Sequence, residues 1–497
     1  MMAIPFMNAL LLYPRFPDTF WSLKHALRFI RKRAASPPLG LLTVAAMLPP
    51  AWAKRLVDVN VSNLEDRDLA WADIVLLSGM IVQQESACEI IARCQRAGVK
   101  VVAGGPLFTG DPDRFAHVDH LVLNEAELTL PLFLADLEQG RPQHLYSTDE
   151  FADVRHTPRP LWRITDLRRY ASMSIQFSRG CPFNCEFCNV TSLFGRRPRT
   201  KSPQQVIAEL NDLYDLGWRG PVFFVDDNLI GNRKELKTLL AALIEWRKTR
   251  RGFVFNTQVS INLADDEQLM RMMADAGFDT VFIGIETPDN DSLIECSKVQ
   301  NKNRDLVADV KRIQRVGMQV QGGFIVGFDS DRPSIFQRQI DFIQTSGIVT
   351  AMVGLLQAPP GTRLFERLRQ QGRLLGAITG DNVDGTTNIQ PSMGLKALRE
   401  GYRSILSQIY SPRNYYQRIR TFLREYRPPS VRAPFGFQRP MAFARSVVRL
   451  GVIGRERVQF WYLLLWTLLH RPRLFGHAVT LAILGYHFRL VCEAQVT

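Results

Sequence analysis

The chain of 497 residues is too long for one ordinary hydrophobic core, so we expect two or three domains. Its hydrophobic content of 46% and charged content of 22% exclude a disordered chain. Seven cysteines in so long a chain exclude a disulfide scaffold. Their odd number and local clustering indicate a reducing compartment with metal or redox chemistry.

The net charge of +14 is concentrated at the end of the chain. From Gly401 onward the sequence contains fifteen arginines, no lysine and three acids, Glu425, Glu456 and Glu493, which gives a net +12. A basic block of this kind indicates an anionic partner, either lipid headgroups or nucleic acid. A solvated basic face without a partner is the alternative.

The first residues, MMAIPFMNALLLYPRFP, differ from a secretory leader. No basic residue precedes the apolar stretch, prolines interrupt it, and no small-residue cleavage site follows. Ala9 to Tyr13 is better interpreted as a buried strand. We therefore expect a cytoplasmic protein.

Residues 1–140 alternate short apolar runs with helical patterns. Five runs read as buried strands, namely NALLLYP, KRLVDVN, DIVLLSG, VKVVAGG and DHLVLNE. Strands that alternate with helices predict a doubly wound parallel sheet of the Rossmann-like kind. Ligands of such sheets bind at the carboxyl ends of the strands. Those ends carry Ser78-Gly79-Met80, Gly104-Gly105-Pro106 and Asn124-Glu125-Ala126-Glu127.

The Gly-Gly-Pro turn permits close backbone approach to a large ligand, although any tight turn after a strand can use it. No GxGxxG pattern is present, so a dinucleotide is not favoured. Residues 141–170 contain few apolar runs and are interpreted as a linker.

Residues 171–365 repeat a strand and a helix six times. The strands are SMSIQFS, PVFFVDD, FVFNTQV, DTVFIGIE, MQVQGGFIVGF and GIVTAMVGLL. The helix from Ser202 to Leu216 has Ser202 as its N-cap, Pro203 in its first turn and one apolar stripe. Six such units predict a partial (β/α)6 barrel with its site at the carboxyl ends of the strands.

Residues 366–497 read as a basic, mainly helical extension. Two apolar runs, 458–470 and 474–488, are each shorter than the ~20 residues that span a bilayer. They are interpreted either as helices in the membrane interface or as a buried helical hairpin.

Three cysteines, Cys181, Cys185 and Cys188, follow the first barrel strand with C-x3-C-x2-C spacing. A structural zinc ion needs four protein ligands, but the barrel segment contains no histidine and only one other cysteine, Cys296. A remote fourth ligand stays open, whereas a disulfide would leave one cysteine unpaired. A [4Fe–4S] cluster with one iron free of protein ligands fits better. The missing histidine also disfavours ordinary acid–base chemistry.

This motif resembles that of the radical SAM superfamily, and the resemblance covers about residues 170–365. It implies that S-adenosylmethionine chelates the open iron and is split to a 5′-deoxyadenosyl radical, and that a reducing electron donor is needed. By the same resemblance Phe187 packs near the adenine, Asp226 and Asn228 bind polar groups of SAM, Glu286 binds its ribose or amino group, and Gly323 lies beside the adenine. The family's usual GGE element is replaced here by Asp226-Asp227-Asn228.

The first domain resembles the cobalamin-binding domain of B12-dependent radical SAM enzymes. This resemblance implies that cobalamin contacts Ser78, Gly79, Gly104, Gly105, Pro106, Asn124 and Glu125. No D-x-H-x-x-G motif is present, so we expect cobalamin without a histidine ligand from the protein. The alternative is a degenerate domain that only docks substrate or stabilises the barrel.

The usual reaction of that group is methylation of an unreactive carbon. The opening YPRFPDTFWSLKHALRFIRKRAASPPLGLLTVAAMLP resembles that of hopanoid C-2 methylases. We therefore expect a C-methyltransferase acting on a lipid or other hydrophobic natural product, with its basic end against the inner membrane. The alternatives are a radical SAM enzyme that catalyses cyclisation, rearrangement or oxidation, and a non-enzymatic iron–sulfur protein that binds nucleic acid. A basic end rich in Trp and Leu, rather than in Lys and Gly, disfavours nucleic acid.

Overall fold

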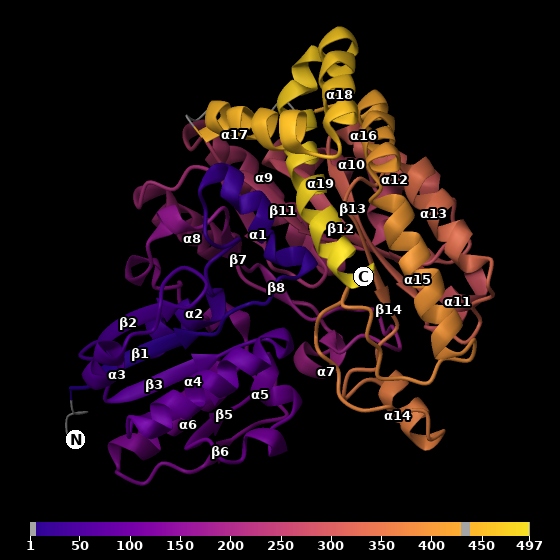
Figure 1. The fold of residues 1–497 in the computed structure, drawn as a ribbon. Helices are drawn as coiled ribbons and strands as arrows, with labels where there is room; N and C mark the ends of the chain where they lie inside the picture. The colour runs from indigo at the N-terminus through magenta and orange to yellow at the C-terminus, as the bar shows by residue number, and fades with distance from the viewer. Residues whose placement is uncertain (1–5, 429–437, 497) are drawn as a thin grey trace.

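The computed structural model describes residues 6–428 and 438–496, and its chain forms two parallel sheets and a helical C-terminal region (Figure 1). One sheet lies at the N-terminal end of the molecule, the second forms a partial barrel, and the C-terminal helices cover one side of that barrel. This architecture confirms the predicted fold class.

The first sheet contains six parallel strands in the order β2-β1-β3-β4-β5-β6. The strands are β1 (Asn8–Tyr13), β2 (Ala53–Asp58), β3 (Ile74–Ser78), β4 (Lys100–Gly104), β5 (His120–Val122) and β6 (Leu145–Tyr146). Five of them are the predicted strands. The sixth comes from the segment interpreted as a linker, so part of that segment extends the sheet.

Helices cover both faces of this sheet: α2 (Leu39–Met47), α3 (Asp66–Trp71), α4 (Gln84–Arg96), α5 (Pro106–Gly110) and α6 (Ala126–Glu138). In β1, Leu10 and Leu12 pack into one buried cluster, whereas Ala9 and Leu11 pack into another. A strand buried on both faces explains why its sequence is a continuous apolar run. The strand order reverses between β1 and β3, where ligands of doubly wound sheets bind.

The barrel contains six parallel strands in the order β14-β13-β12-β11-β10-β7. Its strands are β7 (Met173–Ile175), β10 (Pro221–Phe224), β11 (Val254–Gln258), β12 (Phe278–Glu286), β13 (Gln319–Val326) and β14 (Ala351–Leu355). Its helices are α8 (Pro203–Asp215), α9 (Arg233–Thr249), α10 (Glu267–Ala276), α11 (Asn290–Glu295), α12 (Leu306–Val316) and α13 (Ile335–Ser346). Ser202 caps α8 as predicted, and Gln205 completes a capping box.

A segment near the N-terminus leaves the first sheet and packs on the barrel. It contains two short 3-10 helices, Phe20–Ser22 and Arg28–Ile30, on either side of α1 (Lys24–Leu27). Phe20 and Phe29 belong to the hydrophobic cluster of the barrel, and the ring of Phe20 stacks on Phe488 at 4.2 Å between centroids. Residues 1–140 therefore do not form one self-contained body.

The C-terminal region is helical after a non-helical stretch over residues 371–394. Its helices are α14 (Arg363–Gln370), α15 (Leu395–Ile409), α16 (Pro412–Glu425), α17 (Gln438–Ser446), a π-helix (Val447–Ile453), α18 (Arg457–His470) and α19 (Phe475–Val496). The two predicted apolar runs are α18 and α19. The segment Pro472–Ala494 is long and apolar enough to cross a membrane, but 67% of its most apolar window is buried inside the protein. For α19 this burial favours the interpretation as a core helix.

Candidate functional site

The three clustered cysteines lie in a loop that begins just after β7. The loop is closed by a short antiparallel hairpin, β8 (Ser178–Arg179) with β9 (Arg199–Thr200), and contains the single-turn helix α7 (Val190–Phe194). Gly180 has φ +94°, and a Cβ there would lie 2.9 Å from the carbonyl oxygens of Phe194 and Gly195. Only glycine fits this turn, which leads directly into Cys181.

All seven cysteines are free thiols. Burial raises the pKa of Cys181, and it raises that of Cys188 to about 12, where the neighbouring thiols add to the rise. The three thiols of the loop are therefore close enough to oppose one another's ionisation. Within residues 6–428 and 438–496, no three His, Cys, Asp or Glu side chains converge as ligands of a single metal ion. Three sulfur donors in one loop fit a cluster of iron and sulfide with one iron left open.

Two amide side chains contact these thiols. Asn228 was predicted as a SAM contact and not as a partner of a thiol, and Gln300 was not predicted as a site residue. Asn228 Nδ2 lies 3.9 Å from Cys181 Sγ, and Gln300 Nε2 lies 3.8 Å from Cys185 Sγ. Asn228 is held by Ser260, whose backbone N–H donates to Asn228 Oδ1 at 3.2 Å. Hydrogen bonds to cluster sulfurs are one means by which proteins set cluster potentials.

Asp226, which was predicted to bind SAM, is engaged by groups of the chain itself. Its carboxylate is fully buried and accepts hydrogen bonds from the backbone N–H groups of Phe177 and Ser178 and from the Ser178 hydroxyl. Burial raises the pKa of Asp226 to about 7, although those hydrogen bonds lower it. Asp226 therefore anchors the chain where it leaves β7 and enters the cysteine loop.

Glu286 lies at the carboxyl end of β12 in a buried ion pair. Its φ is +64°, and the pairing of β12 with β13 shifts register there. Lys298 Nζ lies 2.5 Å from Glu286 Oε1, and both side chains are about nine-tenths buried. Burial lowers the pKa of Lys298, but Glu286 and the thiols of Cys185 and Cys188 raise it overall. The ammonium is thus a permanent positive charge beside the thiols.

Phe187 and Gly323, the two residues predicted to lie near the adenine, each pack against other side chains of the protein. The ring of Phe187 lies 6.3 Å from that of Phe328 and 6.0 Å from Lys298 Nζ. A Cβ on Gly323 would lie 2.8 Å from the ring of Phe282. Gly323 is therefore required by packing inside the barrel, whatever else it contacts.

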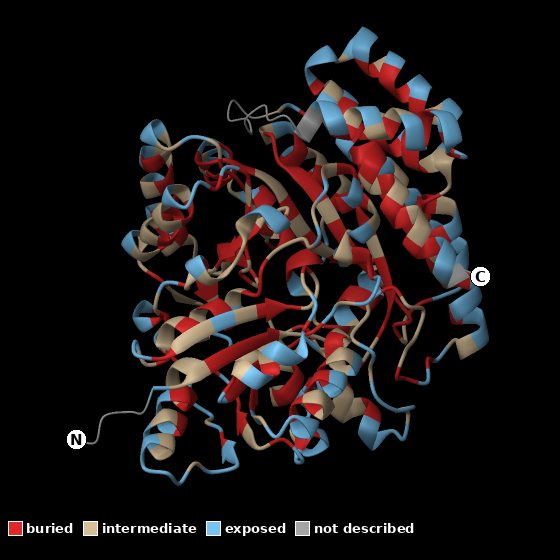
Figure 2. Ribbon diagram, turned by 60° about the vertical axis from the view of Figure 1, so that its left-hand side comes forward, coloured by how far each residue is buried: buried red, intermediate tan, exposed pale blue. Residues whose placement is uncertain are grey.

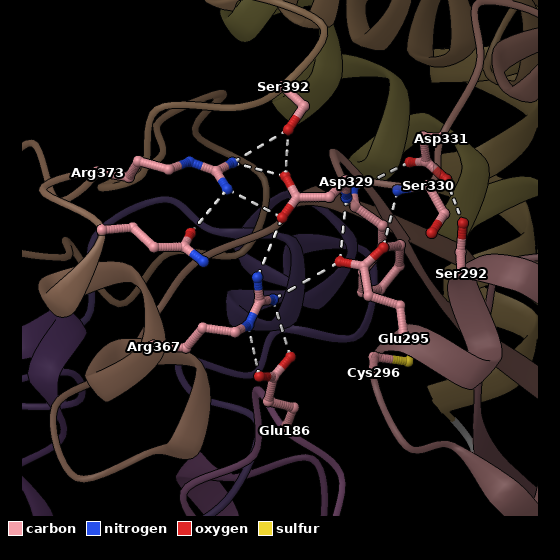
Figure 3. Close-up of polar contacts among 12 residues, drawn as sticks. Glu186, Ser292, Glu295, Cys296, Asp329, Ser330, Asp331, Arg367, Arg373 and Ser392 are labelled. Carbon is pink, nitrogen blue, oxygen red and sulfur yellow. Dashed lines mark hydrogen bonds and ion pairs between the residues drawn. The ribbon is translucent and has the colours of Figure 1, made fainter.

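A network of ion pairs holds the cysteine loop from its other side (Figure 3). Glu186, between Cys185 and Cys188, accepts two hydrogen bonds from Arg367 of α14, at 2.7 and 3.0 Å. Arg367 also donates to Asp329 at 3.1 Å, and Arg373 donates to the same carboxylate at 2.6 Å. The C-terminal region thus fixes the loop that carries the thiols.

Most residues predicted to contact cobalamin lie together at the carboxyl edge of the first sheet. Ser78 ends β3, Gly104 ends β4, and Gly105 has φ +87° at the start of α5. A Cβ on Gly104 would approach the Val122 carbonyl oxygen of β5, and a Cβ on Gly105 would approach Ser78 Oγ, each at 2.4 Å. The strands therefore come together closely at this edge, which presents mainly backbone to a ligand.

Glu125 has a different partner from the predicted one. Its two carboxylate oxygens accept from Arg199 of β9, at 2.7 and 2.8 Å, and its Oε2 also accepts from the backbone N–H of Ala152. The side chain that was expected to meet cobalamin is thus engaged by the cysteine-loop hairpin. Asn124 stays at the edge with φ +62° and receives the backbone N–H of Thr148.

A second carboxylate completes this contact between the two sheets. Glu127 accepts from Arg179 of β8 at 2.7 and 3.0 Å and from the Thr157 hydroxyl at 2.7 Å. Burial raises the pKa of Glu127, but Arg179 outweighs it and holds that pKa at about 2. The carboxyl edge of the first sheet is therefore fixed against the loop that carries the thiols.

Family models match three parts of the chain. Residues 33–134 match the B12 binding domain, residues 175–342 match the Radical SAM superfamily, and residues 362–497 match a domain of unknown function, DUF4070. The first two matches lie on the first sheet and on the barrel, which the β8–β9 hairpin of the cysteine loop connects through Glu125 and Glu127.

Curated relatives match almost the whole chain. An uncharacterized methyltransferase from Synechocystis sp. is 42% identical over 97% of this chain and 91% of its own length. The hopanoid C-2 methylase of Rhodopseudomonas palustris is 33% identical over 91% of this chain and 88% of its own length.

Solved structures share the fold. The cobalamin-dependent S-adenosylmethionine radical enzyme OxsB, with aqua-cobalamin bound, has a TM-score of 0.63 at 13% identity and covers 99% of this chain and 80% of its own. The radical S-adenosylmethionine methyltransferase TsrM from Kitasatospora setae has a TM-score of 0.57 at 15% identity and covers 74% and 78%. With the two joined edges and the loop of three thiols, these similarities show that the chain belongs to the cobalamin-dependent radical SAM methyltransferases.

Proposed function

We propose that the protein methylates an unactivated carbon of a lipid or other hydrophobic natural product. The observation that carries the substrate class is the similarity to a hopanoid C-2 methylase along nine-tenths of the chain. We also propose residues 1–140 as the cobalamin domain, 141–170 as a connector, 171–365 as the radical SAM barrel and 366–497 as the C-terminal domain. The segment from Phe20 to Ile30 is an exception, because it belongs to residues 1–140 but packs on the barrel.

The residues present fit the three cofactors. Cys181, Cys185 and Cys188 would hold the [4Fe–4S] cluster, and SAM would meet the open iron beside four residues, Phe187, Asn228, Glu286 and Gly323. Cobalamin would lie on Ser78, Gly79, Gly104, Gly105, Pro106 and Asn124, and on the backbone of Glu125. When bound, the cluster and SAM supply radical chemistry at carbon, and cobalamin supplies a transferable methyl group.

The buried side chains around the loop have separate tasks in this arrangement. Lys298 places a positive charge beside the thiols, which would favour a ligand that carries a carboxylate, and Glu286 keeps that ammonium in place. Asn228 and Gln300 donate to the thiols. Asp226 and Glu186 do not reach the cofactors but hold the two ends of the loop.

An apolar wall inside the barrel supports a hydrophobic substrate. Trp21 from the N-terminal segment lies edge-on to Phe282, with ring centroids 5.5 Å apart, and its Nε1 lies 3.0 Å from Met352 Sδ. Side chains alternate along a strand, so Phe282 points away from Val281 and Ile283, which are buried in the barrel core. The inner face between β12 and β14 is therefore lined by aromatic and thioether groups, which suit an apolar ligand.

The test is anaerobic reconstitution with iron, sulfide and cobalamin, followed by incubation with a low-potential chemical reductant, SAM labelled in its methyl group and a hopanoid. We expect label in the lipid together with S-adenosylhomocysteine and 5′-deoxyadenosine. Formation of 5′-deoxyadenosine without S-adenosylhomocysteine or a labelled product would contradict methylation and favour cyclisation or rearrangement. Label transferred only to a water-soluble acceptor would contradict the lipid class alone.

We also propose that the protein works in the cytoplasm at the inner membrane, with a reducing electron donor. The burial of α19 argues against a spanning helix. Contact with the membrane would then be peripheral, through other parts of the basic C-terminal region.

A further inference from the structure

Helix α18 is apolar on both of its faces. One face, with Phe460, Leu463 and Leu464, is buried against the protein. The other carries six exposed apolar or aromatic side chains, with exposed fractions up to 71% at Leu469. They are Val458, Trp461, Tyr462, Leu465, Leu468 and Leu469. A helix that is apolar all round is normally covered on every side.

The preceding helical stretch continues this exposed surface. Met441 of α17 and Val448, Val452 and Ile453 of the π-helix are exposed, and the π-helix packs directly on α18. Met441, Arg445, Val448 and Val452 follow one another at intervals of four, three and four residues, which places them along one side of the helix. We call these ten exposed apolar residues the hairpin surface. It lies at the end of the molecule farthest from the first sheet (Figures 1 and 2).

The charge around the hairpin surface is positive. Residues 438–496 contain eight arginines and two acids. Of the acids, Glu456 is buried and paired with Arg489, and Glu493 pairs with Arg489 and Arg455. From the neighbouring α16, Arg420 lies 4.7 Å from the ring of Tyr462 and Arg424 lies 5.7 Å from that of Trp466. An apolar centre with a basic rim matches an anionic lipid surface.

A pocket of about 140 Å³ adjoins the hairpin surface at Met441 and Arg445. Its other lining residues are Ile30, Arg31, Lys32 and Arg168, so four of its six side chains are cationic. Arg168 is paired with Asp166 at 3.0 Å, and Arg445 donates to the Phe29 carbonyl oxygen. Lys32 donates to the Arg168 carbonyl oxygen at 2.7 Å. Among the residues that the structure describes, one carboxylate, that of Asp166, is thus paired with these four cations.

We propose that the hairpin surface inserts into the interface of an anionic phospholipid bilayer, and that this pocket receives a phosphate-bearing headgroup. The inference rests on the peripheral membrane contact proposed above and gives it residues and a lipid class. Arginine recognises phosphate by paired N–H donors, and the exposed leucines and Trp461 gain by leaving water.

The test measures co-sedimentation of full-length protein with vesicles of pure phosphatidylcholine and of phosphatidylcholine with phosphatidylglycerol. We expect stronger binding to the anionic vesicles. Arg31→Gln/Arg168→Gln should weaken that binding about thirtyfold, which corresponds to about 1 kcal/mol for each basic residue. Arg96→Gln/Arg114→Gln, which removes two exposed charges from the first domain, is the matched control and should bind as wild type does.

A second pair of variants tests insertion. Leu465→Ser/Leu469→Ser should weaken binding to both kinds of vesicle about tenfold or more. The two leucines are exposed in the protein and would leave water only on insertion into the bilayer, and the serines lose that gain. Leu132→Ser/Leu216→Ser alters exposed leucines elsewhere and should have no effect. Methyl transfer to detergent-dispersed substrate is measured in parallel and should be unchanged in all four variants, so loss of docking and loss of chemistry are separable.

Three results would overturn the proposal. Equal binding of wild type to neutral and anionic vesicles would contradict the assignment of the pocket to a phosphate-bearing headgroup. Binding of Leu465→Ser/Leu469→Ser at the wild-type level would contradict insertion of the hairpin surface. Self-association of wild type without vesicles, abolished by that same variant in analytical ultracentrifugation, would instead assign the hairpin surface to a second copy of the chain.

Discussion

The carboxyl edges of the two parallel sheets are built in different ways, although each is expected to hold a cofactor. The barrel edge uses side chains, namely three thiols, a buried Glu286–Lys298 pair and amides that contact sulfur. The edge of the first sheet uses glycine and backbone, with strands close together at Gly104 and Gly105. A covalent and charged ligand set demands particular functional groups, whereas a large flat ligand demands shape. Substitutions at the barrel edge should therefore remove functional groups, whereas substitutions at the edge of the first sheet should change its shape.

The largest effect is expected at the thiols. Cys185→Ser should lose most of the cluster's visible absorption and iron, and methyl transfer should fall to background, because two thiolates leave a second iron unligated. Cys88→Ser, at an exposed cysteine of α4, is the control and should retain both. Full iron content and turnover in Cys185→Ser would show that another residue completes the ligand set.

The next effect is expected at the buried ion pair. Lys298→Met leaves the Glu286 carboxylate buried without a partner, and should lower the free energy of unfolding by about 3 to 5 kcal/mol. SAM affinity, measured by equilibrium dialysis, should fall as well. Lys298→Met/Glu286→Gln should recover most of the stability in urea but not the affinity. Recovery of both would show that the pair only supports the fold.

A smaller effect, dependent on pH, is expected at Asp226. The pKa of this buried carboxyl is raised to about 7 in the folded protein, against roughly 3.9 unfolded. Its contribution to stability is therefore complete below about pH 4 and is lost as the pH rises through 7. Wild type should lose about 2 to 3 kcal/mol more than Asp226→Asn between pH 5 and pH 8 in urea unfolding. If wild type and Asp226→Asn lose the same stability between pH 5 and pH 8, the raised pKa of Asp226 is contradicted.

The smallest effect is expected at the backbone edge. Gly105→Ala should cost about 1 to 2 kcal/mol, because its backbone conformation is reserved for glycine and the new Cβ meets Ser78 Oγ. Cobalamin retention after gel filtration should fall with it. Gly79→Ala places its Cβ at ordinary contact distances of 3.5 to 3.7 Å and should change stability little. If Gly105→Ala and Gly79→Ala lost stability and cobalamin retention equally, the result would argue against a site defined by the shape of the backbone.

The sequence predicted what depends on local pattern. Alternating strands and helices, the N-cap Ser202 and the C-x3-C-x2-C spacing are all readable within a few residues. Asp226 was assigned to SAM, and in the structure its carboxylate accepts hydrogen bonds from Phe177 and Ser178, which lie 49 and 48 residues earlier in the chain. Nothing in the local pattern around Asp226 indicated these partners.

The supports of the site could not be read from the sequence because their partners are remote. Glu186 and Arg367 are 181 residues apart, and Glu127 and Arg179 are 52 apart. Nothing in the local pattern distinguishes these charges from others on a solvated surface. Lys298 and Gln300 were also missed, since their nearness to the thiols depends on how the chain folds back after α11.

The packing of the N-terminal segment has a consequence for synthesis of the protein. Phe20 leaves the ribosome early, but it stacks on Phe488, and its carbonyl oxygen lies 3.0 Å from Nε2 of His487, 467 residues later. Both sheets can be complete in the nascent chain before this contact exists. The segment that carries Trp21 to Phe282 of the barrel therefore gains this support only after α19 has left the ribosome, well after both sheets have emerged.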